Sequence, residues 1–210
     1  MATPTHSFYN QLNQAYDFFN QKLFYGILPH CLITIQRTNR SYGYFAHNRF
    51  GTRDGQEVTD EIALNPSHFK ERTTQEVLST LVHEMVHLWQ HHYGQLSRTR
   101  YHNRQWAKKM KAVGLIPSHT GQAGGKQTGQ NMSHYIEPDG VFERACTELI
   151  EQGFTLPYIE RWGKKEVQIR KKKTASKTKY TCPECSLNAW AKPNVFIICG
   201  VCQVTLIAQK

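Results

Sequence analysis

The chain has 210 residues, enough for one domain of medium size with a small appendage. Hydrophobic residues make up 39% and charged residues 20%, which are ordinary values for a globular protein in water. No run approaches the roughly 18 apolar residues of a membrane helix, and residues 1–10 lack the basic start and apolar stretch of a secretory signal. We therefore expect a cytoplasmic protein. The net charge of +10 favours a polyanionic partner, nucleic acid first.

The first part of the chain predicts a helix followed by three strands. Residues 8–25 carry apolar side chains at helical spacing, with Ser7 as the expected cap and Gly26 as the expected stop. Alternating or β-rich stretches then predict strands over residues 31–37, 42–50 and 61–64.

A long helix is predicted next. Thr73 and Glu76 form the pattern of a capping box, apolar residues then recur at helical spacing, and Gly94 is a natural end. After a loop, a shorter helix is expected over residues 103–113.

The following segment is poor in apolar residues. Residues 117–133 are rich in Gly, Ser and Thr, which predicts a flexible loop at the surface or near a cleft. Asp139 could then cap a last helix that ends at Gly153.

The long helix contains the motif His83-Glu84-Met85-Val86-His87. Residues four apart lie on one face of a helix, so His83 and His87 can reach the same metal ion. Glu84 lies beside that ion, where it can take a proton from a water molecule whose pKa zinc lowers to about 7. This pattern indicates a metal-dependent hydrolase.

A catalytic zinc needs a third protein ligand and an open position. His91 lies about 12 Å along the helix axis from His83, and His92 points to the opposite face, so neither fits. The compact HExxHxxGxxH arrangement also fails, because Gln90 and Tyr93 stand at its glycine and third histidine.

The remaining candidates for the third ligand are His102 and two carboxylates. Glu143 or Glu148 of the last helix could serve. His102 is favoured, because it follows a helix stop and a loop that can fold back over His87.

The last part of the chain predicts a separate small module. Residues 161–179 read as a basic linker, and residues 180–210 contain two CxxC pairs with 13 residues between them. Each pair can form a tight turn around a metal, and the gap leaves room for a β-hairpin. We expect a structural zinc ion in a zinc ribbon, held by Cys182, Cys185, Cys199 and Cys202.

The stretch LVHEMVHLWQ, with His102 fifteen residues after His87 and then Gly114, resembles the SprT-like zinc metalloprotease family, which includes the DNA-dependent protease Spartan. The resemblance extends from residue 8 to about residue 115. It implies an α+β, zincin-like metalloprotease domain over residues 1–160, with one catalytic zinc on His83, His87 and His102 and with Glu84 catalytic. Many relatives have Gly where this chain has Asn103.

The resemblance further implies an endopeptidase that DNA activates and that cleaves DNA-bound or DNA-crosslinked proteins. We expect the cytoplasmic protein to be nucleoid-associated if the source is bacterial. The basic residues favour contacts with single-stranded or duplex DNA without sequence preference. Trp190 could stack on a base or belong to the core. The expected DNA-contacting residues are Arg98, Arg100, Arg104, Arg170, Lys171, Lys172, Lys173 and Trp190.

The alternative function is a non-proteolytic adaptor, a zinc-ribbon nucleic-acid-binding or transcription-associated protein with a vestigial HExxH motif. The intact Glu84 argues against it, because drift would easily spoil that residue. A metal count separates the two hypotheses, since the enzyme needs two zinc ions per chain and the adaptor needs only the ribbon ion.

Overall fold

The computed structural model describes residues 3–39, 41–98, 101–161 and 177–209. The chain divides into two compact units, Met1–Arg161 and Trp162–Lys210. Most of the linker expected over residues 161–179 lies outside the described residues. Within the described residues, no helix combines the length and the apolar character that a membrane span requires.

The first unit begins with helix α1, Pro4–Phe24. Its N-cap is Thr3, whose hydroxyl accepts a hydrogen bond from the His6 amide, so the prediction of Ser7 as the cap was wrong. Pro4 suits the first turn because its missing N–H would be unpaired there in any case. Tyr25 ends the helix in a left-handed conformation, just before Gly26.

The three predicted strands form one mixed sheet: β1 (Leu32–Ile35), β2 (Gly43–Gly51) and β3 (Val58–Leu64). β3 is central, parallel to β1 and antiparallel to β2. The β2–β3 register shifts between Ala46 and Phe50, which indicates a bulge. A 3-10 turn, Pro66–His68, follows β3.

Helix α2, Thr74–Tyr93, runs against this sheet. It begins at the predicted capping box, in which Thr73 and Glu76 bond each other's backbone amides, and it ends at Gly94. The approach of β2 to α2 is close, because a Cβ on Gly43 would lie 2.9 Å from Thr80 Cγ2. The buried apolar side chains of α2 form the centre of the core: Val77, Leu78, Leu81, Val82, Met85, Val86 and Leu88.

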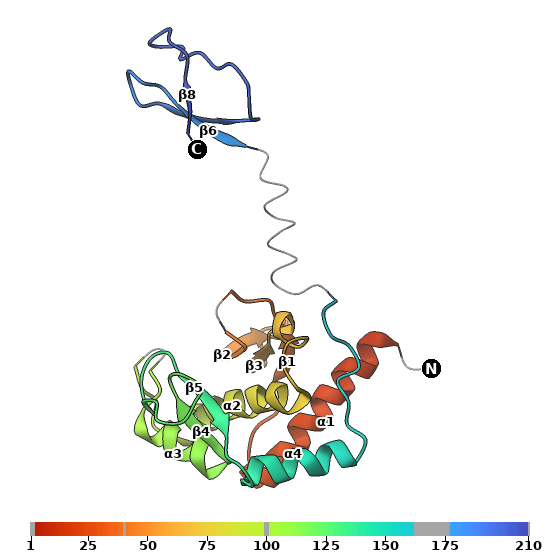
Figure 1. Cartoon of the computed structure of the whole chain (residues 1–210). Helices are drawn as coiled ribbons and strands as arrows, with labels where there is room; N and C mark the ends of the chain where they lie inside the picture. Colours follow the sequence, from red (N-terminus) through yellow and green to blue (C-terminus); the bar gives the residue numbers. More distant parts are fainter. Residues whose placement is uncertain (1–2, 40, 99–100, 162–176, 210) are drawn as a thin grey trace. The chain divides into compact units, whose positions relative to one another are not determined.

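The rest of the first unit consists of α3 (Arg104–Ala112), a hairpin of β4 (Leu115–Ser118) and β5 (Ser133–Ile136), and α4 (Val141–Glu151). The four helices lie on one side of the three-stranded sheet (Figure 1). The predicted cap of α4 was wrong: Gly140 is the N-cap, without a side-chain hydrogen bond, and Asp139 precedes it with φ 56°. The unit is therefore a mixed α+β domain.

The second unit is a three-stranded sheet of β6 (Thr178–Thr181), β7 (Asn188–Ala191) and β8 (Ile207–Gln209), in the order β7-β6-β8. The hairpin encloses the first cysteine pair instead of filling the gap between the pairs, because β6 precedes Cys182 and only β7 lies in the gap. The buried core consists of Tyr180, Cys182, Cys199 and Leu206.

Candidate metal centres

The three predicted histidine ligands come together in the first unit. His83 and His87 lie on one face of α2, and His102 lies two residues before α3. One ring nitrogen from each lies within 4.8 Å of the others, and the Nε2 atoms of His87 and His102 are 3.1 Å apart. Two nitrogen ligands of a tetrahedral zinc lie about 3.3 Å apart, so this spacing fits a shared ion.

The backbone sets the ring orientation of His102. Its Nδ1 lies 3.1 Å from the Gly129 carbonyl oxygen, and the backbones of the two residues pair in an antiparallel bridge. An Nδ1–H that donates to this carbonyl leaves the Nε2 lone pair free for a metal. The segment over residues 117–133, predicted as a flexible loop, is thus fastened to His102 at Gly129.

Burial keeps the cluster neutral. Desolvation lowers the pKa of His83, which the neighbouring His134, His87 and His102 lower further. The same cause lowers the pKa of His87 to about 3. A metal ligand must be a neutral imidazole, so the donor chemistry fits zinc.

His134 lies behind His83, a position that sequence reasoning did not assign to it. The Nδ1 atoms of the two rings are 3.0 Å apart, and His134 Nε2 is 2.9 Å from Ser79 Oγ. Ser79 Oγ in turn donates to the Glu76 carbonyl oxygen at 2.8 Å. If His83 Nε2 faces a metal, its Nδ1–H can donate to His134 Nδ1. The Nε2–H of His134 then donates to Ser79 Oγ, and the Ser79 hydroxyl donates to the Glu76 carbonyl, so all three hydrogen bonds are satisfied. His134 would therefore orient His83 as a metal ligand.

Replacing His134 with alanine is expected to lower zinc affinity at the His83 cluster roughly 10- to 100-fold, because the ring of His83 loses its orienting partner. Competition with a chromophoric chelator measures this affinity. His134→Gln keeps both a donor and an acceptor and is expected to recover part of the loss. Equal affinity for the wild-type chain and His134→Ala would show that His134 only fills space.

Trp106 of α3 supports all three histidine rings. Its side chain is fully buried, and its ring lies 5.1 Å from that of His83, 5.4 Å from that of His87 and 4.3 Å from that of His102. The large apolar ring excludes water from the back of the cluster, which strengthens electrostatic interactions there.

Asn103, the residue after His102, fastens the start of α3 to the end of α2. Its Oδ1 accepts hydrogen bonds from the Trp106 amide at 2.9 Å and from Gln90 Nε2 at 2.8 Å. The residue is thus both the N-cap of α3 and the partner of a buried amide of α2. It holds the loop that carries His102.

Replacing Asn103 with alanine is expected to destabilise the first unit by about 1–2 kcal/mol, because the helix cap and the partner of Gln90 are lost together. Thermal unfolding followed by circular dichroism measures the change. Asn103→Asp keeps the accepting oxygen and should stay close to the wild-type chain. A melting temperature unchanged in Asn103→Ala would contradict the capping role.

Glu84 is the buried carboxyl group next to the cluster. Only 6% of the residue is exposed, and desolvation raises the pKa of its carboxyl to about 8, although a hydrogen bond from the Phe45 amide of β2 opposes the rise. The alternative carboxylate ligands are engaged elsewhere. Glu148 forms an ion pair with Lys22 of α1 at 2.8 Å, and Glu143 accepts a hydrogen bond from the Asp139 amide.

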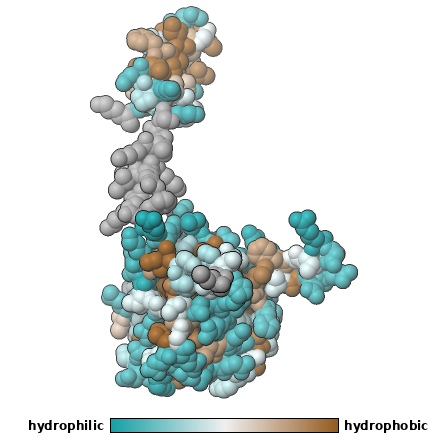
Figure 2. Space-filling view, turned by 90° about the vertical axis from the view of Figure 1, so that its right-hand side faces the viewer, coloured by the Kyte–Doolittle hydropathy of each residue, from teal (hydrophilic) through white to brown (hydrophobic). Residues whose placement is uncertain are grey.

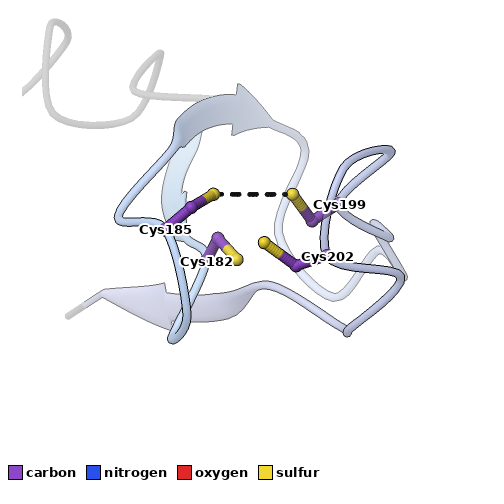
Figure 3. Close-up of side chains that lie close together, drawn as sticks. All are labelled: Cys182, Cys185, Cys199 and Cys202. Carbon is purple, nitrogen blue, oxygen red and sulfur yellow. Dashed lines mark hydrogen bonds between the residues drawn. The ribbon is translucent and has the colours of Figure 1, made fainter.

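The four predicted cysteines gather in the second unit (Figure 3). Their sulfurs lie within 4.8 Å of one another, and the Cys185 and Cys199 sulfurs are 3.7 Å apart. Two sulfur ligands of a tetrahedral zinc lie about 3.8 Å apart. The cluster thus resembles that of a zinc ribbon, and its four thiols could hold a zinc ion.

The two cysteine pairs form turns of the same design. The amides of Cys182 and Cys199 donate to the carbonyls of Leu187 and Val204, in each case at 2.8 Å. The fourth residue after each of these cysteines is left-handed, Ser186 with φ 60° and Gln203 with φ 57°. This repetition is typical of paired metal-binding turns. Within the second turn, the backbone amides of Cys202 and Val201 lower the pKa of the Cys199 thiol to about 7, which favours the thiolate that binds a metal.

Of the predicted DNA-contacting residues, Arg98, Arg104 and Trp190 can be placed. Arg98 and Arg104 are exposed, with the Arg98 guanidinium 4.6 Å from the centre of the Tyr101 ring. Trp190 is 61% exposed, so it is not a core residue. The other predicted positions, Arg100, Arg170, Lys171, Lys172 and Lys173, lie outside the described residues.

A cluster of three buried or half-buried histidines beside a helical carboxyl group, on a mixed α+β domain, defines a metalloprotease-like domain. The SprT-like family matches the chain over residues 12–125, and the chain belongs to this family. An uncharacterized protein in the mucB 3' region of Salmonella typhimurium is 52% identical over 59 residues, which make up 28% of this chain and 80% of that protein.

Proposed function

We propose that the chain is a zinc-dependent endopeptidase that cleaves proteins bound or crosslinked to DNA. The convergence of three neutral imidazole donors beside Glu84 supports the proposal most directly. Membership of the SprT-like family, which is associated with a zinc metallopeptidase-like domain, supports it further. On this proposal the first unit is zincin-like and the second is a zinc ribbon.

In the proposed site, His83, His87 and His102 hold the catalytic ion. When bound, zinc supplies a Lewis acid that polarises the scissile carbonyl and makes a water molecule more acidic. A bound dication would favour the ionised form of Glu84 and so oppose the rise in pKa that burial causes. In that form Glu84 takes a proton from the attacking water and later returns it to the leaving amine nitrogen. His134 and the Gly129 carbonyl contact His83 and His102, so these two imidazoles would already be oriented before substrate binds.

The DNA contacts are proposed for two surfaces. On the second unit, Lys179 of β6 lies directly opposite Trp190 of β7, so an ammonium group and an exposed indole occupy one face of the sheet. A base can stack on the indole while the lysine contacts a phosphate, without sequence readout. On the first unit, Arg98 and Arg104 lie near His102 in the chain and would hold DNA near the His83 cluster.

The test is proteolysis by the zinc-loaded full chain with and without DNA. A protein crosslinked to a single-stranded or duplex oligonucleotide is the substrate, and the same protein free in solution is the comparison. Cleavage of the crosslinked protein that exceeds cleavage of the free protein, and that falls as salt is raised, is expected. Equal cleavage of both would remove the DNA part of the proposal, and no cleavage of either would favour the adaptor.

A further inference from the structure

A second cluster of histidines lies at the end of α2, separate from the proposed catalytic site. It consists of Asp60 of β3 with His91 and His92 in the last turn of the helix. One carboxylate oxygen and one nitrogen from each ring lie within 4.8 Å of one another. The cluster shares no residue with the His83 cluster.

Hydrogen bonds fix the position of the Asp60 carboxylate in this cluster. Asp60 is 5% exposed, and its Oδ1 accepts a hydrogen bond from the Asn48 amide at 2.7 Å. Its Oδ2 lies 2.7 Å from His92 Nε2, a direct hydrogen bond that would widen to about 3.3 Å when both atoms bind one ion. Asn48 has φ 47° and lies within the bulge of β2. A nearly buried carboxylate needs a cationic partner or a metal ion. The bulge thus holds one carboxylate oxygen and leaves the other facing the histidines.

Two further features favour a cation at this position. His91 and His92 occupy the C-terminal turn of α2, where the helix dipole is negative. The ring of His47, on β2, is stacked on that of His91 with centroids 4.7 Å apart, so a third imidazole lies beside the cluster. Two imidazoles and one carboxylate form a donor set that suits zinc and its neighbours in the transition series better than calcium or magnesium.

We propose that Asp60, His91 and His92 form an additional binding site for zinc or a similar divalent transition metal. The ion would link the bulged part of β2 and the start of β3 to the C-terminal turn of α2. It would therefore stabilise the sheet edge without taking part in the reaction at the His83 cluster. The proposal does not depend on the proposed proteolytic activity.

The test is a count of zinc ions per full chain after dialysis against buffered free zinc. The wild-type chain is expected to bind three ions, and His91→Gln and His92→Gln two each. His30→Gln removes an exposed imidazole outside the cluster and is expected to keep all three. Zinc added beyond the second equivalent should raise the melting temperature of the wild-type chain and not that of His91→Gln.

The zinc count distinguishes failure of the Asp60–His91–His92 site from failure of the proposed catalytic site. His87→Ala removes the ion of the His83 cluster, and the double variant with His92→Gln should retain only the ion of the four cysteines. If the His83 cluster binds no zinc, His92→Gln still lowers the count by one. The proposal is overturned if His91→Gln and His92→Gln bind as many ions as the wild-type chain. Should His92→Gln fail to fold without the partner of Asp60, His91→Gln decides alone.

Discussion

Replacing Glu84 with glutamine is expected to reduce peptide-bond cleavage roughly 10²- to 10⁴-fold, the usual contribution of a general base. The amide is as large as the carboxyl group but cannot take a proton from water. Because Glu84 is not one of the three ligands, the variant should bind zinc at the His83 cluster as the wild-type chain does. Initial rates on the crosslinked substrate, together with the zinc content of the same sample, measure both expectations.

The variant should also be at least as stable as the wild-type chain. Burial penalises the charged form of Glu84, and a neutral amide in the same position avoids that cost. A melting temperature no lower than that of the wild-type chain would show that a loss of activity does not come from unfolding. Glu148→Gln, in which an exposed carboxylate on α4 is changed instead, is the matched control and should keep full activity. Glu84→Gln activity within a few-fold of the wild type would show that another group takes the proton.

The elements predicted well from the sequence have local determinants. Helix α2 begins and ends where its capping box and Gly94 place it, because those signals act within a few residues. The His83–His87 pair follows from helical spacing alone. The cap of α1 was missed because Thr3-Pro4 and Ser7 both offer a plausible start, and the proline at the first position marks the correct one.

The parts of the site that were missed depend on contacts between distant segments. His134 reaches His83 from a strand 51 residues later, and its position follows from the pairing of β5 with β4. Asp60 meets His92 across 32 residues, and Gly129 meets His102 across 27. No periodicity or local motif encodes such pairings, because they arise only when the sheet and helices pack. Gly129 lies in a stretch poor in apolar residues, so the sequence predicted a loop there but not the contact with His102.

Removing zinc from the second unit is expected to unfold it while the first unit stays folded. Among residues 177–209, only Tyr180, Cys182, Cys199 and Leu206 are buried, and two of these four are cysteines of the cluster. Large apolar residues lie instead on its surface, such as Phe196 at 91% and Val201 at 84% exposed, and Figure 2 shows apolar patches on this unit. Because this core is too small to offset the entropy lost when the chain becomes ordered, metal binding must supply most of the folding free energy of the unit.

Cys199→Ser, which removes one of the four thiolates, is the variant that tests this dependence. The dispersed amide resonances of residues 177–209 in a ¹H–¹⁵N NMR spectrum should collapse, as they should when a strong chelator is added to the wild-type chain. Resonances of the first unit should remain dispersed in Cys199→Ser. Cys31→Ser removes a half-buried thiol of the first unit and should leave residues 177–209 unchanged. Because the Lys179–Trp190 pair exists only in the folded sheet, Cys199→Ser should also weaken binding of single-stranded DNA. Dispersed resonances that persist after chelation would mean that the strands of this unit hold together without a metal.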